Sequence, residues 1–365
     1  MPLIFSLVMK FLGLLTFFFG GCFWLFSQQE KPLTTAFPFL LLGTDAAASG
    51  RGNLGVVATP DVFSQRWNSA KYTFTEQKMG IGMSYVPYLH QRVRDIFLGN
   101  MSYYRKTTRG AWAGSFTYFS IGEVKLIDDF QGSAYVLGGF RPIEFALDAS
   151  YNLKLSERFS LGVLARYLRS DLRLPTEEKY VGAGFSCDIS GYYTSKEHLL
   201  GAYFGSVVLG FQLSNLGMKI KYDDLGRDFF LPTNLKLGAG YVLTFDSVNK
   251  VSFLLEVNKL LVSTSGDVDV IQGVFKSFSD ALGGFSEELQ EVFGSVGLEY
   301  AYDTGFFLRT GYFYQHENKG GRKHLSFGTG FRLNHWQFDF SYLFSTGKIA
   351  GFLSKSANVS LQYSF

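Results

Sequence analysis

From about Lys78 to the C-terminus, polar and apolar residues alternate in runs that are separated by turn-forming residues. The clearest run is Ser356 to Phe365, in which every second residue is apolar and the residues between them are Ser, Asn or Gln. A period of two is that of a β-strand with one apolar face. In a soluble sheet protein covers that face, whereas in an outer-membrane barrel it contacts lipid and the polar face lines the lumen.

We count about fourteen such runs, an even number that suits a closed antiparallel barrel. The predicted strands are Lys78–Val86, Asp95–Arg105, Gly110–Glu123, Ala134–Leu153 with an interruption near Pro142, Arg158–Leu168, Tyr180–Thr194, Gly201–Asn215, Pro232–Phe245, Val251–Lys259, Gly294–Tyr302, Gly305–Tyr314, Arg322–Leu333, Trp336–Phe344 and Ser356–Phe365. The fold class is therefore all-β, a transmembrane barrel that occupies residues 75–365.

The predicted connections alternate between short and long. Short ones include Lys106–Arg109 and Asp303–Thr304, and long ones include Glu123–Tyr135, Leu216–Leu231 and Leu260–Phe293. Outer-membrane barrels show this asymmetry, with tight periplasmic turns and long extracellular loops. A soluble sandwich has no reason to sort its loops in this way, so we favour the barrel, with both termini in the periplasm.

The N-terminus reads as an export signal over residues 1–27. Lys10 precedes an apolar stretch from Phe11 to Phe26, and the small residue Ser27 follows it. Two alternatives are a lipoprotein signal with Cys22 as the lipid-bearing residue, and a membrane-anchor helix.

Residues 28–74 do not alternate and are rich in small residues around Ser49–Gly55. A segment of this size can fold into a barrel lumen as a plug, or hatch. The alternative is a periplasmic tail. The residues that we single out for the plug are Asp45, Ser49, Arg51, Gly52, Trp67, Asn68 and Ala70.

The longest connection, Leu260–Phe293, is predicted to be helical. Val268–Phe278 has helix-like apolar spacing, and Ser286 with Glu287 and Glu288 is typical of the capped, acidic first turn of a second helix that ends near Phe293. This extracellular loop either packs over the barrel mouth or forms a docking surface for a partner.

Composition adds exclusions to this picture. The net charge of +3 and the lack of a Lys/Arg block argue against a nucleic-acid partner. Beyond the N-terminus no apolar run approaches the roughly 18 residues of a membrane helix, so strands must make any membrane span. The five histidines lack metal-ligand spacing, and Asp223 and Asp224 are more typical of a solvated loop than of a calcium site. We predict no enzyme activity, catalytic residue, metal or cofactor, and we expect Tyr363 and Phe365 to act as a C-terminal signal for barrel assembly.

Several segments together resemble the PorV family of the type IX secretion system and, more widely, the FadL-like barrels. They are Pro38–Leu42 leading into Asp45, Ser49–Gly55, Pro60 with Asp61, Trp67–Tyr72, Asn258–Leu261, Gly283–Leu289, and Gly311 with His316–Arg322. Ser69 departs from the FadL-like pattern, which usually has proline after the asparagine.

The resemblance implies a fourteen-stranded barrel with a hatch, and a role in secretion. It implies that the chain contacts membrane lipid and the large barrel subunit of the type IX translocon. It also implies that the chain binds the C-terminal domains of cargo and passes them to the surface attachment complex with its PorU-like sortase. The candidate cargo-facing residues are Asp223, Asp224, Phe278, Phe285, Glu287 and Glu288. The competing functions are a FadL-type transporter of hydrophobic small molecules and a porin.

Overall fold

The computed structural model describes residues 35–88, 95–130, 133–172, 181–222, 228–263, 268–281, 284–347 and 356–365. The chain divides into two units, Met1–Lys31 and Pro32–Phe365, and the described residues all belong to the second. The predicted signal peptide over residues 1–27 therefore lies outside the described residues.

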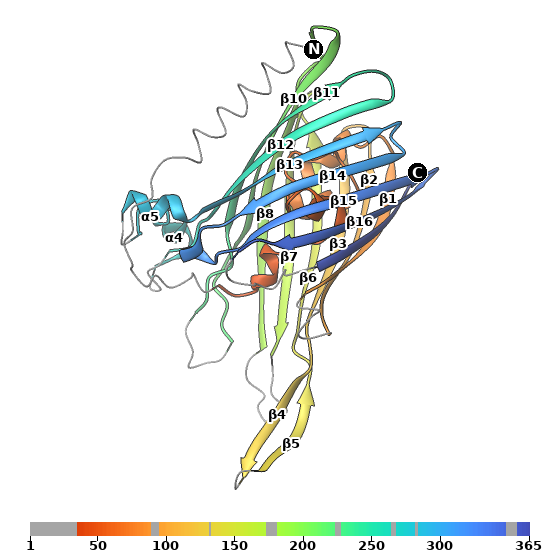
Figure 1. Cartoon of the computed structure of the whole chain (residues 1–365). Coiled ribbons are helices and arrows are strands. Elements are labelled where there is room, and N and C mark those ends of the chain that lie inside the picture. Colours follow the sequence, from red (N-terminus) through yellow and green to blue (C-terminus); the bar gives the residue numbers. More distant parts are fainter. Residues whose placement is uncertain are drawn as a thin grey trace. The chain divides into compact units, whose positions relative to one another are not determined.

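Fourteen antiparallel strands close into a barrel, as the sequence predicts. The strands of the ring are β1 (Met79–Pro87), β2 (Ile96–Lys106), β3 (Gly110–Ile121), β6 (Ile143–Lys154), β7 (Phe159–Asp171), β8 (Val181–Thr194), β10 (Tyr203–Gly217), β11 (Asn234–Thr244), β12 (Asn249–Leu260), β13 (Val292–Tyr302), β14 (Phe306–Tyr314), β15 (Lys323–Leu333), β16 (Trp336–Ser345) and β17 (Ser356–Ser364). Each strand pairs with its neighbours in the ring, and β1 pairs with β17 to close it (Figure 1).

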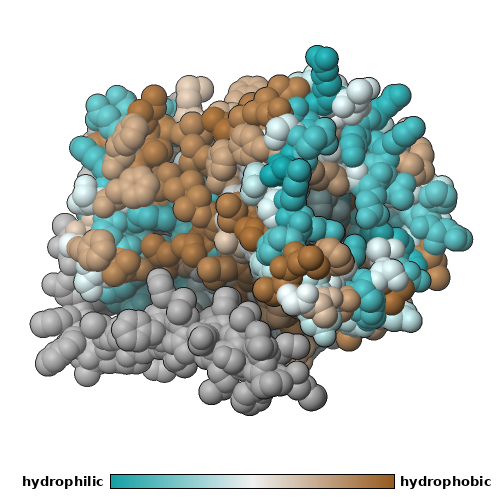
Figure 2. All heavy atoms as spheres, turned by 90° about the horizontal axis from the view of Figure 1, so that it is seen from above, coloured by the Kyte–Doolittle hydropathy of each residue, from teal (hydrophilic) through white to brown (hydrophobic). Residues whose placement is uncertain are grey.

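The period of two separates the two faces of the barrel wall. Along β17, Ser356, Asn358 and Ser360 are buried, whereas Ala357 and Val359 between them are exposed. The same alternation along the other strands exposes large apolar side chains on the outer wall. Figure 2 shows such side chains gathered over a broad area of one face. Since a water-soluble protein rarely exposes so much apolar surface, the pattern is that of a wall in contact with lipid.

The connections are sorted by length between the two ends of the barrel. The end with the tight turns, such as Asp303–Gly305 between β13 and β14, is called here the short-turn end. The opposite end, with connections such as that between β12 and β13, is called the long-loop end. Within the described residues, this sorting agrees with the prediction from the sequence.

Two connections contain strands that the sequence did not predict. The connection Glu123–Tyr135 was expected to be a loop, but β4 (Val124–Phe130) pairs there with β5 (Ser133–Phe140) in a hairpin separate from the ring (Figure 1). The predicted run Ala134–Leu153 is accordingly divided between β5 and β6 on either side of Pro142, which has no backbone N–H to donate to a ladder. A short strand, β9 (His198–Leu200), pairs with β10 at the short-turn end.

The N-terminal segment, defined here as residues 36–75, packs inside the ring (Figure 1). It contains η1 (Pro38–Leu41), α2 (Ala46–Gly50), α3 (Ser64–Trp67) and η2 (Ser69–Phe74). Its apolar side chains form three clusters with inward-facing residues of the wall. Phe37 and Phe39 pack with Leu168 and Leu343 towards the long-loop end. Val62 and Tyr72 pack with Tyr104 towards the short-turn end. The third cluster contains Leu54, Val56, Val57 and Ala58.

The connection between β12 and β13 contains two short helices, α4 (Val270–Lys276) and α5 (Phe285–Gln290). The expected helices are thus present but shorter than predicted. Ser286 does not cap α5, because the helix begins at Phe285, with Gly284 at the N-cap and no side-chain cap bond. Across the described part of the chain, no helix is long and apolar enough to cross a membrane.

Candidate functional site

Asp45 joins two parts of the N-terminal segment. Its Oδ1 accepts a hydrogen bond from the Ala48 backbone N at 2.8 Å and so caps α2. Its Oδ2 accepts one from Trp67 Nε1 at 2.6 Å, at the end of α3. The indole also lies 5.2 Å from the Lys236 ammonium of the barrel wall. Two of the residues that the sequence singled out, Asp45 and Trp67, therefore contact one another.

Asn68 and Ala70 fasten the segment to β8. Asn68 Nδ2 donates to the backbone oxygens of Val56 and Gly191 at 3.0 and 2.9 Å. Its Oδ1 accepts from Ala70 N. Ser69, the residue that departs from the FadL-like pattern, lies 3.1 Å from Ser190 through their hydroxyls, a contact that proline could not make.

Gly52 lies against the wall where no side chain has room. Its φ of 77° is in the left-handed region that favours glycine. Gly52 N donates to Ser326 Oγ at 2.9 Å, and Gly52 O accepts from Ser295 Oγ at 2.6 Å. On β14, Gly311 faces this backbone, and a Cβ there would lie 2.2 Å from the carbonyl carbon of Arg51. The glycine in the wall therefore leaves room for the Arg51–Gly52 backbone to approach β14.

Arg51 enters a buried ion network. It pairs with Glu299 of β13, which also accepts from Arg309 Nε at 2.6 Å and from Thr59 Oγ1 at 3.0 Å. Arg309 in turn pairs with Asp339 of β16 at 2.6 Å. All four ionised side chains are at most 4% exposed. The network connects the N-terminal segment to three strands of the wall.

A second buried network lies on the opposite part of the ring. Arg166 of β7 pairs with Asp148 of β6 at 2.8 Å and with Asp188 of β8 at 3.1 Å. It also donates to the amide of Asn215, a residue at φ 60° in a register shift of β10 against β8. Asp188 accepts the backbone N–H of Asn215 at 2.8 Å as well. This network joins four strands and fixes the irregular part of β10.

The structure brings the seven predicted plug residues together in one segment, with Ser49 buried in α2, but it also shows partners that sequence reasoning missed. Glu256 and Glu299 bond to the segment directly, and Arg309 and Asp339 extend the pair at Glu299. Asp148, Arg166 and Asp188, which sequence reasoning also missed, pair with one another within the wall. Glu256, for example, accepts the backbone N–H groups of Gly55 and Val56 at 3.0 Å each. The sequence contained a sign of these residues, because they stand at the polar positions of the alternating strands, which face the lumen.

The protonation of Asp45 provides a test of its role in holding the N-terminal segment together. Burial, followed by the charge of Asp61, raises the pKa of Asp45 from 3.8 to about 6. The folded state therefore holds a proton that the unfolded state releases between these values, so the free energy of unfolding falls as the pH rises through this window and stays lower above it.

We expect Asp45→Asn, which carries no charge, to be less stable than the parent at pH 4 and to lose part of that disadvantage at pH 7. The measurement is the temperature at which the detergent-solubilised barrel loses its compact band in SDS, taken at both pH values. A difference between the two proteins that does not change with pH would contradict the assignment to Asp45.

The helical loop presents apolar side chains while its acidic groups are turned inward. Phe278 and Phe285 are 51% and 78% exposed. Glu287 and Glu288, which the sequence suggested as cargo-facing, are buried in ion pairs, Glu287 with Lys319 at 2.5 Å and Glu288 with Lys259 at 2.7 Å. Glu288 therefore holds α5 against the end of β12, and Glu287 holds it against the connection between β14 and β15.

The remaining candidates are placed as follows. Asp223 and Asp224 lie outside the described residues. Tyr363 and Phe365 lie at the short-turn end with their ring centroids 5.4 Å apart, and Tyr363 also packs edge-on against Trp336 at 4.8 Å. Among the residues that the structure describes, no group of three or more His, Cys, Asp or Glu side chains could hold a metal ion.

Comparison with known families gives one decisive match. A model of the family described as "Type IX secretion system protein PorV" matches residues 26–267, which is more than half of the 365 residues. The chain belongs to the PorV family. A search among curated proteins finds no match.

Solved structures agree with a PorV-family barrel. The Pseudomonas putida toluene transporter TodX is 11% identical, with 88% of this chain and 99% of that chain covered and a TM-score of 0.51. A TodX deltaS2S3 mutant, described as a monoaromatic hydrocarbon channel, is 11% identical, with 89% and 99% covered and a TM-score of 0.53. A Pseudomonas aeruginosa FadL homologue is 11% identical, with 88% and 98% covered and a TM-score of 0.46. At these identities the TodX structures show the fold, that of a FadL-like barrel.

The PorV-family chain is therefore an outer-membrane protein. PorV proteins and FadL-like transporter barrels are not enzymes.

Proposed function

We propose that this protein receives the C-terminal signal domains of exported proteins from the large barrel subunit of the type IX translocon. It then passes them to the surface attachment complex that contains a PorU-like sortase. The family match over residues 26–267 supports a role in type IX secretion. The helical loop supplies the observation that favours a binding role.

Five large apolar side chains of the helical loop are exposed beyond the strands. They are Ile271, Phe275, Phe278, Phe285 and Leu289, with exposed fractions between 51% and 78%. Apolar side chains on the strands contact lipid, whereas a loop beyond the membrane meets water, where an exposed apolar patch commonly marks a binding surface. Long loops of outer-membrane barrels face the cell exterior, which is the side on which exported cargo emerges. We propose that this loop patch contacts cargo.

The acidic residues of α5 have a positioning role in this proposal. Lys259 pairs with Glu288 and Glu291 at 2.7 and 2.8 Å, and Lys319 pairs with Glu287 and Glu291 at 2.5 and 3.3 Å. These bonds hold α5 in place although the helix is short. A surface held in place before binding loses less conformational entropy when a partner binds.

We propose that residues 28–74 act as a hatch that seals the lumen while cargo is handled outside. The buried networks at Arg51 and Glu256 support this role, because they fasten the segment to the wall. A hatch would keep small solutes from leaking through the barrel during secretion.

The double variant Phe278→Ser with Phe285→Ser is expected to weaken capture of a cargo C-terminal domain by roughly tenfold or more, since buried aromatic anchors dominate binding energy. The measurement is pull-down of a tagged cargo domain by the detergent-solubilised protein, together with cargo accumulation in the periplasm of cells that carry the variant. Lys276→Ser, an exposed change in the same loop, is the control and should leave capture unchanged. Normal capture and surface attachment with the double variant would contradict the proposal.

A FadL-type transporter is the second candidate, and one observation favours it. An apolar cluster lies beneath the loops at the long-loop end, occupied by Phe37, Phe39 and Leu40 of the chain itself. The two TodX proteins are described as a toluene transporter and a monoaromatic hydrocarbon channel. In that case cells without the protein would show defective uptake of hydrophobic compounds with cargo secretion intact.

A further inference from the structure

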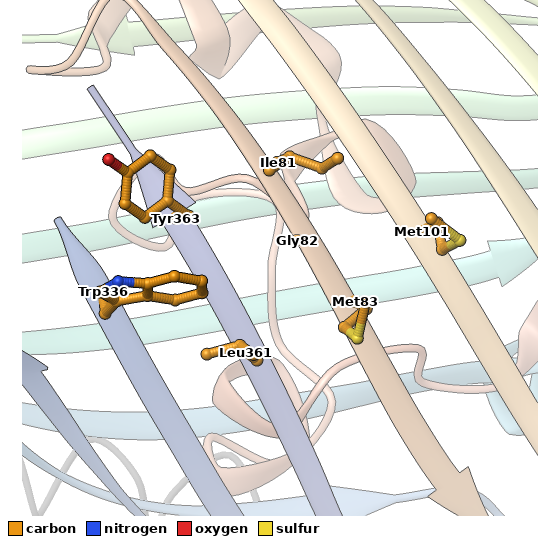
Figure 3. Close-up of a pocket in the computed structure, with 7 residues that line it drawn as sticks. All are labelled: Ile81, Gly82, Met83, Met101, Trp336, Leu361 and Tyr363. Carbon is orange, nitrogen blue, oxygen red and sulfur yellow. The ribbon is translucent and has the colours of Figure 1, made fainter.

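A hollow of about 270 Å³ opens on the outer wall of the barrel, over the pairing of β1 with β17. The side chains that line it are Ile81, Met83, Met101, Trp336, Leu361 and Tyr363 (Figure 3). Between Ile81 and Met83, Gly82 contributes only backbone to the lining, because a Cβ there would point into the lumen, 2.9 Å from the Phe63 ring. The volume is close to the lower end of pockets that hold small molecules, about 300 Å³.

The strand register explains why these residues gather. Tyr363 is opposite Ile81, and Leu361 is opposite Met83, across the β1–β17 pair. Met83 is in turn opposite Met101 on β2, and Trp336 on β16 is opposite Tyr363. Residues directly opposite one another on one face lie side by side. The lining is therefore a continuous apolar patch that crosses four strands and faces the lipid side.

One end of the hollow is marked by aromatic side chains that have polar tips. Trp336 and Tyr363 lie at the short-turn end, and Tyr103 and Trp112 are exposed on β2 and β3 near the same end. Trp and Tyr gather where a membrane meets water. From this interface the hollow runs along the wall towards Met101 and Leu361, which is the direction that an acyl chain takes into the bilayer.

Positive charge lies just beyond this aromatic end. Arg105 is exposed on the outward face of β2, two residues after Tyr103 and opposite Met79. Two strand residues span about 7 Å, so the guanidinium is near the level of lipid phosphates when the aromatic tips are at the interface. Lys78, the residue before β1, is exposed at the same end, and Glu76 is the nearest acidic residue along the chain.

We propose that this hollow binds one acyl chain of a phospholipid in the leaflet at the short-turn end, and that Arg105 and Lys78 hold the lipid phosphate. Apolar lining and adjacent basic residues together fit a molecule with a long hydrocarbon chain and an anionic head. Annular lipid, by contrast, exchanges freely along the wall and shows no preference for one head group. The site requires no movement of the N-terminal segment, since it lies on the opposite face of the wall.

Bromine on a lipid chain quenches a tryptophan in contact with it, so Trp336 can report occupancy. The probe is phosphatidylglycerol with brominated chains, titrated into dioleoylphosphatidylcholine bilayers that contain the Trp112→Phe protein without the predicted signal peptide, which carries Trp24. Trp67, buried in the lumen, should stay unquenched. We expect saturable quenching at low mole fraction, with the anionic lipid preferred over phosphatidylcholine by roughly fivefold to tenfold.

Arg105→Gln in the same background should lower that preference by roughly fivefold, the effect of one basic residue near an anionic lipid. Arg109→Gln, an exposed change in the next turn, is the matched control and should keep the preference. Leu361→Phe, which fills the hollow, should weaken saturation even with Arg105 present. Migration of each variant as a compact band in unheated SDS shows that it folds.

Three results would overturn the proposal. The first is equal quenching by brominated phosphatidylglycerol and brominated phosphatidylcholine. The second is an equal loss of preference in Arg105→Gln and Arg109→Gln, which would indicate general surface charge. The third is protein–protein cross-linking through a Met101→Cys variant in place of lipid contact, which would assign the hollow to a second membrane protein.

Discussion

Arg166→Met is expected to destabilise the barrel by about 3–5 kcal/mol, because it leaves the buried carboxylates of Asp148 and Asp188 without a counter-ion. The arginine side chain is 1% exposed, so water cannot replace the lost partner without opening the lumen. Asn215 would also lose its donor where β10 changes register against β8. The measurement is the temperature at which the compact band in SDS converts to the unfolded form.

Two further variants separate loss of the ion network from loss of one arginine. Arg109→Met, at an exposed turn position, should leave that temperature unchanged. Adding Asp148→Asn and Asp188→Asn to Arg166→Met should restore part of the stability, since the unpaired buried charges are then removed. A transition for Arg166→Met that matches that of Arg109→Met would show that the network does not stabilise the barrel.

Gly311→Val is expected to push the N-terminal segment off the wall. A Cβ at this position would lie 2.2 Å from the carbonyl carbon of Arg51 and 2.4 Å from the backbone nitrogen of Gly52, and neither backbone atom can turn away as a flexible side chain does. Overpacking of this kind costs about 1–3 kcal/mol of free energy. Here it weakens the contact between the N-terminal segment and the barrel wall. We expect faster proteolysis within residues 36–75 and higher ion conductance in planar bilayers.

Gly99→Val is the matched control for this experiment. Gly99 also lies within a strand, but a Cβ there meets no atom closer than 4.0 Å. Its conductance and protease resistance should equal those of the unmodified protein. If Gly311→Val also leaves both properties unchanged, the segment is held by contacts other than the Arg51–Gly52 approach.

The barrel was predictable because its signal is local and repeated. Alternation of period two, turn residues and connection lengths can all be read without knowing which strands pair. The β4–β5 hairpin escaped prediction since its first strand contains Asp128 and Asp129, and aspartate is depleted in strands. The helices α4 and α5 were recognised from apolar spacing and acidic residues, with ends that differ by a few residues from those expected.

The roles of individual charged residues were harder to read. Glu287 and Glu288 look like a solvated acidic turn in sequence, yet two lysines from other segments bury them. Likewise, Arg51 was recognised as part of the plug, but its partner Glu299 is 248 residues away. No short-range pattern encodes such a pairing, because it depends on which strand faces the segment inside the closed ring.

The sequence by itself determined the fold class, the strand count, the sorting of the loops and which face of each strand is apolar. These follow from a periodicity that each strand carries independently of the others. Only the tertiary structure decided how the lumen is filled, which charges neutralise one another, and where the wall is hollowed over β1 and β17. Those features arise when ring closure brings distant strands together. A buried inward-facing charge is costly without a partner of opposite charge, and the closed ring supplies that partner.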